Sequence, residues 1–89
     1  MHKHTVTTAN GNSFKRNSAN RIYPFVAIQT CNHNGKITEK AVMWSGTREG
    51  LRKEITYRTN RHANGIAKGW WGPEYVYTYA ILDTSVVTK

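Results

Sequence analysis

The sequence predicts an α+β protein in which an antiparallel sheet of three or four strands is covered on one face by a single helix. β-rich runs on both sides of Asn34-Gly35 indicate a hairpin, and EYVYTYAIL, residues 74–82, alternates as a further strand. Between them lies a segment with helical spacing and capping residues, which gives the order ββ-α-β. Because the chain has only 89 residues, residues 1–89 are expected to form one domain.

The central hairpin is predicted at about residues 22–31 and 36–44. Asn-Gly favours a two-residue turn because both residues tolerate positive φ, and such a turn fixes the strand register. The predicted cross-strand pairs are Ile28 with Ala41, Val26 with Met43, and Phe25 with Trp44. The residues expected on the core face of this hairpin are Val26, Ile28, Ile37, Ala41 and Met43.

A second Asn-Gly pair, Asn10-Gly11, predicts an additional hairpin within residues 1–21. This segment carries four basic residues and no acidic one, and the flanks of the turn are polar. The burial of apolar surface is the main source of stability, and polar strands bury little of it. We therefore expect a basic N-terminal hairpin that is partly mobile.

The helix is predicted at about residues 48–62. Ser45 or Thr47 can cap its N-terminus, and Glu49 suits the positive end of the helix dipole. Asn64-Gly65 is typical of a helix end. The exposed side of this helix is expected to carry several arginines.

The apolar side of the helix is expected to pack on the core face of the sheet. Leu51 and Ile55 lie four residues apart and so share one side of the helix. In the last strand, the side chains assigned to this core are those of Val76, Ala80 and Leu82. Alternation then places on the opposite, aromatic face Tyr75, Tyr77, Tyr79 and Ile81.

The segment GWWGP, residues 69–73, is expected to turn sharply into the last strand, because Pro73 fixes φ and two glycines free the backbone. Adjacent side chains in an extended segment point to opposite sides. We therefore expect one of Trp70 and Trp71 to anchor the loop. The other ring is expected to be exposed near the tyrosines, with Lys68 nearby.

The net charge of +8 indicates a polyanionic partner, either an acidic protein surface or nucleic acid, RNA or DNA. Residues 48–68 contribute six basic side chains against two acidic ones. A membrane partner is not expected, because the helix lacks a broad apolar face and no apolar run is long enough to span a bilayer. A single cysteine excludes an internal disulfide, which favours a cytoplasmic protein.

Metal binding, cofactor binding and catalysis are not expected. His2-x-His4 and Cys31-x-His33 lack a second pair at a zinc-site separation, and no glycine-rich phosphate loop is present in the sequence. The five acidic residues are scattered, and no orienting group is visible for Cys31 and His33. The sequence therefore favours a binding protein over a small hydrolase or nuclease.

Aromatic rings on an open sheet face, bordered by Lys and Arg, are typical of proteins that stack the bases of single-stranded nucleic acids. Alternatively, the rings pack on each other, on the N-terminal hairpin or on a second copy of the chain, and the helix arginines form a solvated face. The candidate partner-binding residues are Arg48, Arg52, Arg58, Arg61, Lys68, Trp70, Trp71, Tyr75, Tyr77 and Tyr79.

Two resemblances bear on function. A hairpin followed by SGTREG and a basic helix, over about residues 22–60, resembles the sheet-plus-helix modules of phage integrase N-termini and of plant AP2-type DNA-binding domains. Those families place three strands before the helix, whereas here a strand follows it, so no groove-reading residue is carried over. The short chain, with RIYPFVAIQ and WSGTREGLRK, is similar in style to small accessory proteins of phages and other mobile elements, including anti-CRISPR inhibitors.

The second resemblance implies a phage-encoded stoichiometric inhibitor or adaptor in the host cytosol, which occupies a surface on a nucleic-acid-handling complex as a monomer or homodimer. Because the chain is basic, such an inhibitor is expected to contact an acidic protein patch or bound RNA or DNA. The alternative function is a nucleic-acid-binding domain with little sequence preference, which uses the basic helix and the aromatic sheet face.

Overall fold

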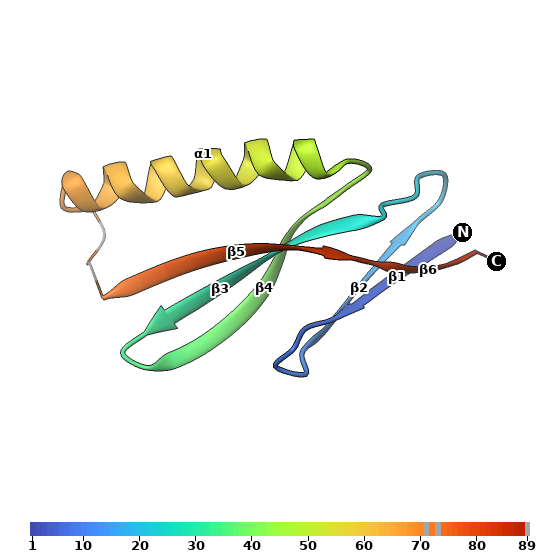
Figure 1. Cartoon of the computed structure of the whole chain (residues 1–89), viewed down its shortest axis with the longest axis horizontal. Helices are drawn as coiled ribbons and strands as arrows, with labels where there is room; N and C mark the ends of the chain where they lie inside the picture. Colours follow the sequence, from blue (N-terminus) through green and yellow to red (C-terminus); the bar gives the residue numbers. More distant parts are fainter. Residues whose placement is uncertain (71, 73, 89) are drawn as a thin grey trace.

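The computed structural model describes residues 1–70, 72 and 74–88, and within these residues it contains six strands and one helix (Figure 1). The α+β class is therefore confirmed. The elements are β1 His2–Thr7, β2 Ser13–Ser18, β3 Phe25–His33, β4 Lys36–Ser45, α1 Arg48–Ala67, β5 Tyr75–Asp83 and β6 Ser85–Thr88.

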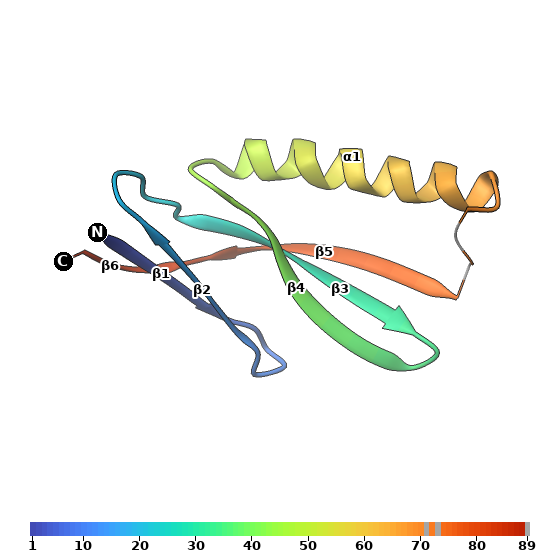
Figure 2. The same cartoon turned by 180° about the vertical axis from the view of Figure 1, so that it is seen from behind.

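The strands form two antiparallel three-stranded sheets. Sheet A has the order β2-β1-β6, and sheet B has the order β4-β3-β5, with α1 lying along sheet B (Figures 1 and 2). Sheet B with its helix corresponds to the predicted helix-covered sheet, and β1 with β2 corresponds to the predicted N-terminal hairpin. The short strand β6 was not predicted, and it joins this hairpin to the C-terminal end of the chain.

The last two strands form one continuous segment that passes from sheet B into sheet A (Figure 1). The crossing point, Thr84, is held by the loop before β3. The Thr84 N–H donates to the Pro24 carbonyl at 2.9 Å, and its hydroxyl donates to the Tyr23 carbonyl at 2.6 Å. These bonds fix the relative position of the two sheets.

The two hairpin turns differ from each other. Asn34 and Gly35 have φ of 53° and 86°, which confirms the predicted two-residue turn between β3 and β4. In the β1–β2 connection, Gly11 has φ of 88° and Asn10 does not have positive φ. The Gly11 N–H donates to the Thr8 carbonyl at 2.9 Å, so this turn is a longer loop than the predicted two-residue turn.

A β-bulge interrupts the β3–β4 pairing. Ile28 pairs with Ala41 as predicted, but the register then shifts and Val42 has no partner in β3. The observed pairs beyond this point are Ala27 with Met43, Val26 with Trp44, and Phe25 with Ser45. The predicted pairs Val26–Met43 and Phe25–Trp44 are therefore wrong by one residue. Because one residue is skipped, Trp44 shares the face of Val26, and Met43 lies on the opposite face.

The main core lies between the two sheets. Val26 and Ile28 of β3 are 0% and 2% exposed, and Val6 of β1 is 7% exposed in the same cluster. The partly buried side chains packed against this cluster are Phe14, Ala41, Trp44 and Leu82. This face of sheet B was predicted to be covered by the helix, and that prediction is wrong, because residues of sheet A cover it.

Buried polar groups also connect sheet A to the rest of the molecule. His4 in β1 is fully buried, and its Nε2 accepts the Tyr23 N–H at 2.8 Å. Because Nε2 is the acceptor, the proton lies on Nδ1, which donates to the Arg16 carbonyl at 3.0 Å. Both ring nitrogens are satisfied only in this neutral tautomer. His4 therefore acts as a hydrogen-bonding part of the core.

A carboxylate in sheet B holds the β1–β2 turn. Oε1 of Glu39 accepts the Thr8 hydroxyl at 2.5 Å and the Asn12 side-chain amide at 2.6 Å. The bonds from Thr8 and then Asn12 lower the pKa of Glu39 below its ordinary value. Since these bonds join β4 to the turn of the N-terminal hairpin, they stabilise the contact between the sheets.

This contact predicts acid sensitivity. A carboxyl group with a lowered pKa in the folded state stabilises the protein above its ordinary pKa, and the effect is lost as the pH falls through the lowered value. We expect the melting temperature of the wild type to fall more steeply than that of Glu39→Gln between about pH 6 and pH 3. Parallel pH profiles for the two proteins would contradict this role of Glu39.

The helix is longer than predicted. Thr47 caps its N-terminus by accepting the Gly50 N–H at 3.1 Å, as one of the two predicted caps. The helix continues through Asn64-Gly65 to Ala67, so the predicted end at residue 62 is wrong. The chain leaves the helix at Gly69, with φ of 76°, whose N–H donates to the Ile66 carbonyl at 3.0 Å. This pattern is a Schellman motif one turn later than predicted.

The helix covers the tyrosine face of sheet B, opposite to the face predicted. His62 of α1 contacts the Tyr77 ring edge-on at 4.7 Å between centroids, and its Nε2 donates to the Tyr75 carbonyl at 3.2 Å. Leu51 and Ala27 are both fully buried, and Ala27 lies on the face opposite to Val26 and Ile28. The side chains that were predicted under the helix lie elsewhere: Leu82 packs in the core between the sheets, and Val76 and Ala80 are exposed.

Candidate functional site

A cleft of about 410 Å³ lies between α1 and β5. One wall is formed by helix residues that come after the buried Leu51, and the other wall is the tyrosine face of β5. The helix side chains in this region are large and polar, so the helix does not close against the strand as an apolar helix would. The lining residues are Glu54, Tyr57, Arg58, Arg61, His62, Tyr77 and Tyr79.

A second cleft of about 320 Å³ continues from the first toward the C-terminal end of the helix. The two clefts share Tyr57 and Arg61, so they form one continuous surface, which we call the α1 groove. The second cleft is lined by Tyr57, Asn60, Arg61, Asn64, Lys68 and Trp70.

Helical periodicity creates the α1 groove. Tyr57, Arg61, Asn64 and Lys68 are spaced by four, three and four residues, which places them on one side of a helix. This side extends to Asn64 and Lys68 only because the helix continues past residue 62. The Schellman turn then reverses the chain, and its Trp70 N–H donates to the Gly65 carbonyl at 2.8 Å, which brings Trp70 to the end of the groove.

The basic side chains of the helix fall into two groups. Three are ion-paired on the protein: Arg48 with Asp83 at 3.1 Å, Lys53 with Glu49 at 3.8 Å, and Arg58 with Glu54 at 2.8 Å. Among the residues that the structure describes, Arg52 and Arg61 have no acidic partner within 4.0 Å. Of these two, Arg61 lines both clefts and Arg52 lines neither.

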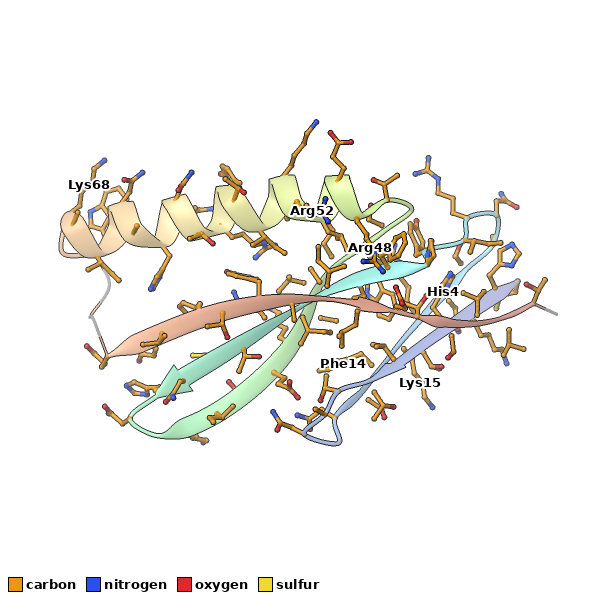
Figure 3. All side chains as sticks on the ribbon, in the orientation of Figure 1. His4, Phe14, Lys15, Arg48, Arg52 and Lys68 are labelled. Atoms are coloured by element: carbon orange, nitrogen blue, oxygen red, sulfur yellow. The ribbon has the colours of Figure 1, made fainter. Side chains whose placement is uncertain are left out.

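Two aromatic rings of the α1 groove are largely exposed. Tyr57 is 60% exposed and Trp70 is 67% exposed. The Lys68 ammonium lies over the Trp70 ring, with Nζ 4.9 Å from its centroid, in cation–π geometry. Lys68 lies at the C-terminal end of α1, far along the helix from Arg48 and Arg52 (Figure 3). The groove thus offers two accessible rings, with Lys68 over Trp70 and with Arg61 one turn after Tyr57 on the same side of the helix.

The strand wall of the groove supplies hydrogen-bonding groups. The Tyr79 hydroxyl accepts a bond from the Gln29 side-chain amide at 2.8 Å, and its own proton remains a donor. Burial, and then the neighbouring Cys31 thiol, raise the pKa of Tyr77 above its ordinary value. Tyr77 therefore keeps its proton at neutral pH and adds no negative charge to the strand side of the groove.

The structure brings together six of the ten predicted partner-binding residues. Those that line the α1 groove are Arg58, Arg61, Lys68, Trp70, Tyr77 and Tyr79. Three others lie apart from it: Arg52 is exposed on the helix, Arg48 pairs with Asp83 over the Phe25 ring, and Tyr75 stacks on His33 at 4.1 Å. Trp71 lies outside the described residues. Trp70 is exposed with Lys68 nearby, as expected for one member of the tryptophan pair, but the cleft that it lines includes none of the β5 tyrosines.

Several residues of the groove were not identified as site residues in the sequence analysis. Tyr57, Asn60 and Asn64 share a helix side with Arg61 and Lys68, and this periodic pattern was available in the sequence. It was lost because Asn64-Gly65 was interpreted as the helix end. His62 and Glu54 were missed for a different reason, because they belong to the site only if the helix covers the tyrosine face.

Other features of the described residues do not form a comparable site. A third cleft, of about 330 Å³, contains Glu39 and no basic side chain. Within the described part of the chain, no group of three His, Cys, Asp or Glu residues is placed to hold a metal ion. No helix in residues 1–70, 72 and 74–88 is both long and apolar enough to cross a membrane.

Comparisons of this chain with protein-family models, with curated proteins and with solved structures found no match. The chemistry of the α1 groove therefore carries the functional interpretation.

Proposed function

We propose that this protein is a small, basic, non-catalytic binding protein that holds nucleic acid in the α1 groove. The observation that carries the proposal is the placement of the two cations Arg61 and Lys68 beside the exposed rings of Tyr57 and Trp70. Cations bind phosphates and exposed rings stack bases, and this combination is typical of surfaces that bind nucleic acids.

The charge of the groove supports this ligand. Among the described residues, neither Arg61 nor Lys68 has an ion-pair partner, and the Lys68 ammonium lies over the Trp70 ring. The one carboxylate in the groove, that of Glu54, is already bound by Arg58 at 2.8 Å. The groove therefore presents net positive charge, and binding phosphate would not break an existing ion pair of Arg61 or Lys68.

We do not assign base stacking to the aromatic sheet face that the sequence suggested, because α1 lies along it. The stacking role passes to rings on the helix and on the turn that follows it. In a cellular setting, we propose that this binding allows the protein to act as a stoichiometric inhibitor or adaptor on a nucleic-acid-handling complex, as the likeness to phage accessory proteins implies.

The proposal predicts a defined salt dependence. Two phosphate contacts on a single strand correspond to a slope of about −1.4 in a plot of log K against log salt. The affinity for a fluorescein-labelled oligonucleotide, measured by anisotropy, should then fall about sevenfold between about 50 and 200 mM salt. The absence of oligonucleotide binding at any of these concentrations would contradict the proposal. It would leave an acidic protein surface as the partner.

A further inference from the structure

The two clefts of the α1 groove suggest a specific form of ligand, an inference that rests on the proposed function. They meet at Tyr57 and Arg61, which contribute to both. Each cleft is bordered by an exposed ring, because Tyr57 stands between the clefts and Trp70 closes the second one. A ligand with repeating flat and anionic groups would fit such an alternation.

The dimensions agree with a short segment of single strand. Residues 57–68 span about 16 Å along the helix axis at about 1.5 Å per residue. This length corresponds to about five nucleotides in a stacked strand at about 3.4 Å each. A strand lying along α1 can therefore reach both rings and both cations, Arg61 and Lys68, at once.

We infer that the α1 groove is selective for single-stranded nucleic acid. One base stacks on Tyr57 at the first cleft and another stacks on Trp70 at the second, while Arg61 and Lys68 bind the intervening phosphates. A duplex hides the faces of its bases in its own stack, so it can offer only phosphates to this groove. Selectivity thus arises from the rings, and the cations alone would not provide it.

Polar groups of the groove fit the edges and phosphates of such a strand. Asn60 and Asn64 line the second cleft and carry both donors and acceptors. In the first cleft, Arg58 uses Nε for Glu54, and its terminal nitrogens have no hydrogen-bond partner among the described residues. These amides and guanidinium nitrogens can bond any base edge or phosphate, which favours low sequence preference.

The test distinguishes the contribution of the aromatic rings to binding from that of the positive charges. Anisotropy would compare a ten-nucleotide labelled single strand with a hairpin duplex of the same sequence, at one salt concentration, for wild type, Tyr57→Leu and Trp70→Leu. We expect the wild type to prefer the single strand by at least about tenfold, and each variant to lose about tenfold for the single strand but not for the duplex. Tyr75→Leu is the matched control, because Tyr75 is an exposed tyrosine outside both clefts, and it should bind as wild type.

The outcomes distinguish this inference from the function on which it rests. Equal affinity for both ligands, with no effect of either ring substitution, would overturn single-strand selectivity and leave a phosphate-binding protein. Failure to bind either ligand would overturn both. Because Tyr57 and Trp70 are exposed, their variants should keep the wild-type melting temperature. Quenching of tryptophan fluorescence by the single strand, reduced in Trp70→Leu, gives a second readout of stacking.

Discussion

Leu51→Ala should lower the free energy of unfolding by about 2–5 kcal/mol, because it removes a fully buried side chain and leaves a cavity. Leu51 is the one large apolar side chain of α1 with no exposed surface among the described residues. Ile55, one turn later, is only half-buried, and most of the other helix side chains that face β5 are polar, so little other apolar burial holds the helix on sheet B. For a domain of this size, the loss corresponds to a fall in melting temperature of at least about 8 °C.

Val76→Thr is the matched control for this substitution. The sequence predicted Val76 under the helix, whereas in the structure it is 54% exposed on the opposite face. Replacing it by another β-branched residue should change stability by no more than about 0.5 kcal/mol. Urea denaturation of both variants would measure the difference. If Val76→Thr were as destabilising as Leu51→Ala, the helix would lie on the other face of sheet B.

The sequence predicted the elements of sheet B well because their signals are local. Asn34-Gly35 is a turn in the structure because two adjacent residues that tolerate positive φ determine it without help from the rest of the chain. Thr47 caps the helix for a similar reason, since its hydroxyl reaches a backbone N–H three residues away. These features depend on few residues, and all of those residues are neighbours in sequence.

The choice of sheet face could not be predicted, because alternation defines two faces without saying what covers each. Both faces of β5 carry apolar side chains, and the cover of the Val26 face comes from β1, which is distant in sequence. The pattern of β1 was obscured because one of its inward residues is His4, a polar residue buried by two specific hydrogen bonds. The β-bulge at Val42 was equally invisible, since it depends on packing across the sheet.

The α1 groove was predicted only in part for the same physical reasons. Arg61, Lys68 and Trp70 were identified from composition and local spacing, and the structure places them along one groove. Tyr57 lies within the predicted helix, but the side that it shares with Asn64 and Lys68 was not recognised because the helix was ended before Asn64. Arg48 and Arg61 looked equivalent in sequence but differ in the structure. Arg48 is ion-paired with Asp83 from the distant strand β5, whereas Arg61 has no acidic partner among the described residues.

The central claim is that the α1 groove, and not the net charge of the chain, binds nucleic acid. Arg61 and Arg52 offer a comparison in which charge is held constant, because both are exposed on α1 and neither is ion-paired among the described residues. Only Arg61 lines the groove. Replacing either by glutamine removes one positive charge and leaves a residue that suits a helix.

The most direct measurement is the ratio of the dissociation constants of Arg61→Gln and Arg52→Gln for one labelled single-stranded oligonucleotide at one salt concentration. A lost hydrogen bond to a charged group costs about 1.5–3 kcal/mol, so Arg61→Gln should bind at least about tenfold more weakly than wild type. Arg52→Gln should lose less than about threefold, as expected for a distant charge screened by salt. Equal losses in the two variants, both of them folded, would show that general charge binds the ligand and would contradict the assignment of the site to the α1 groove.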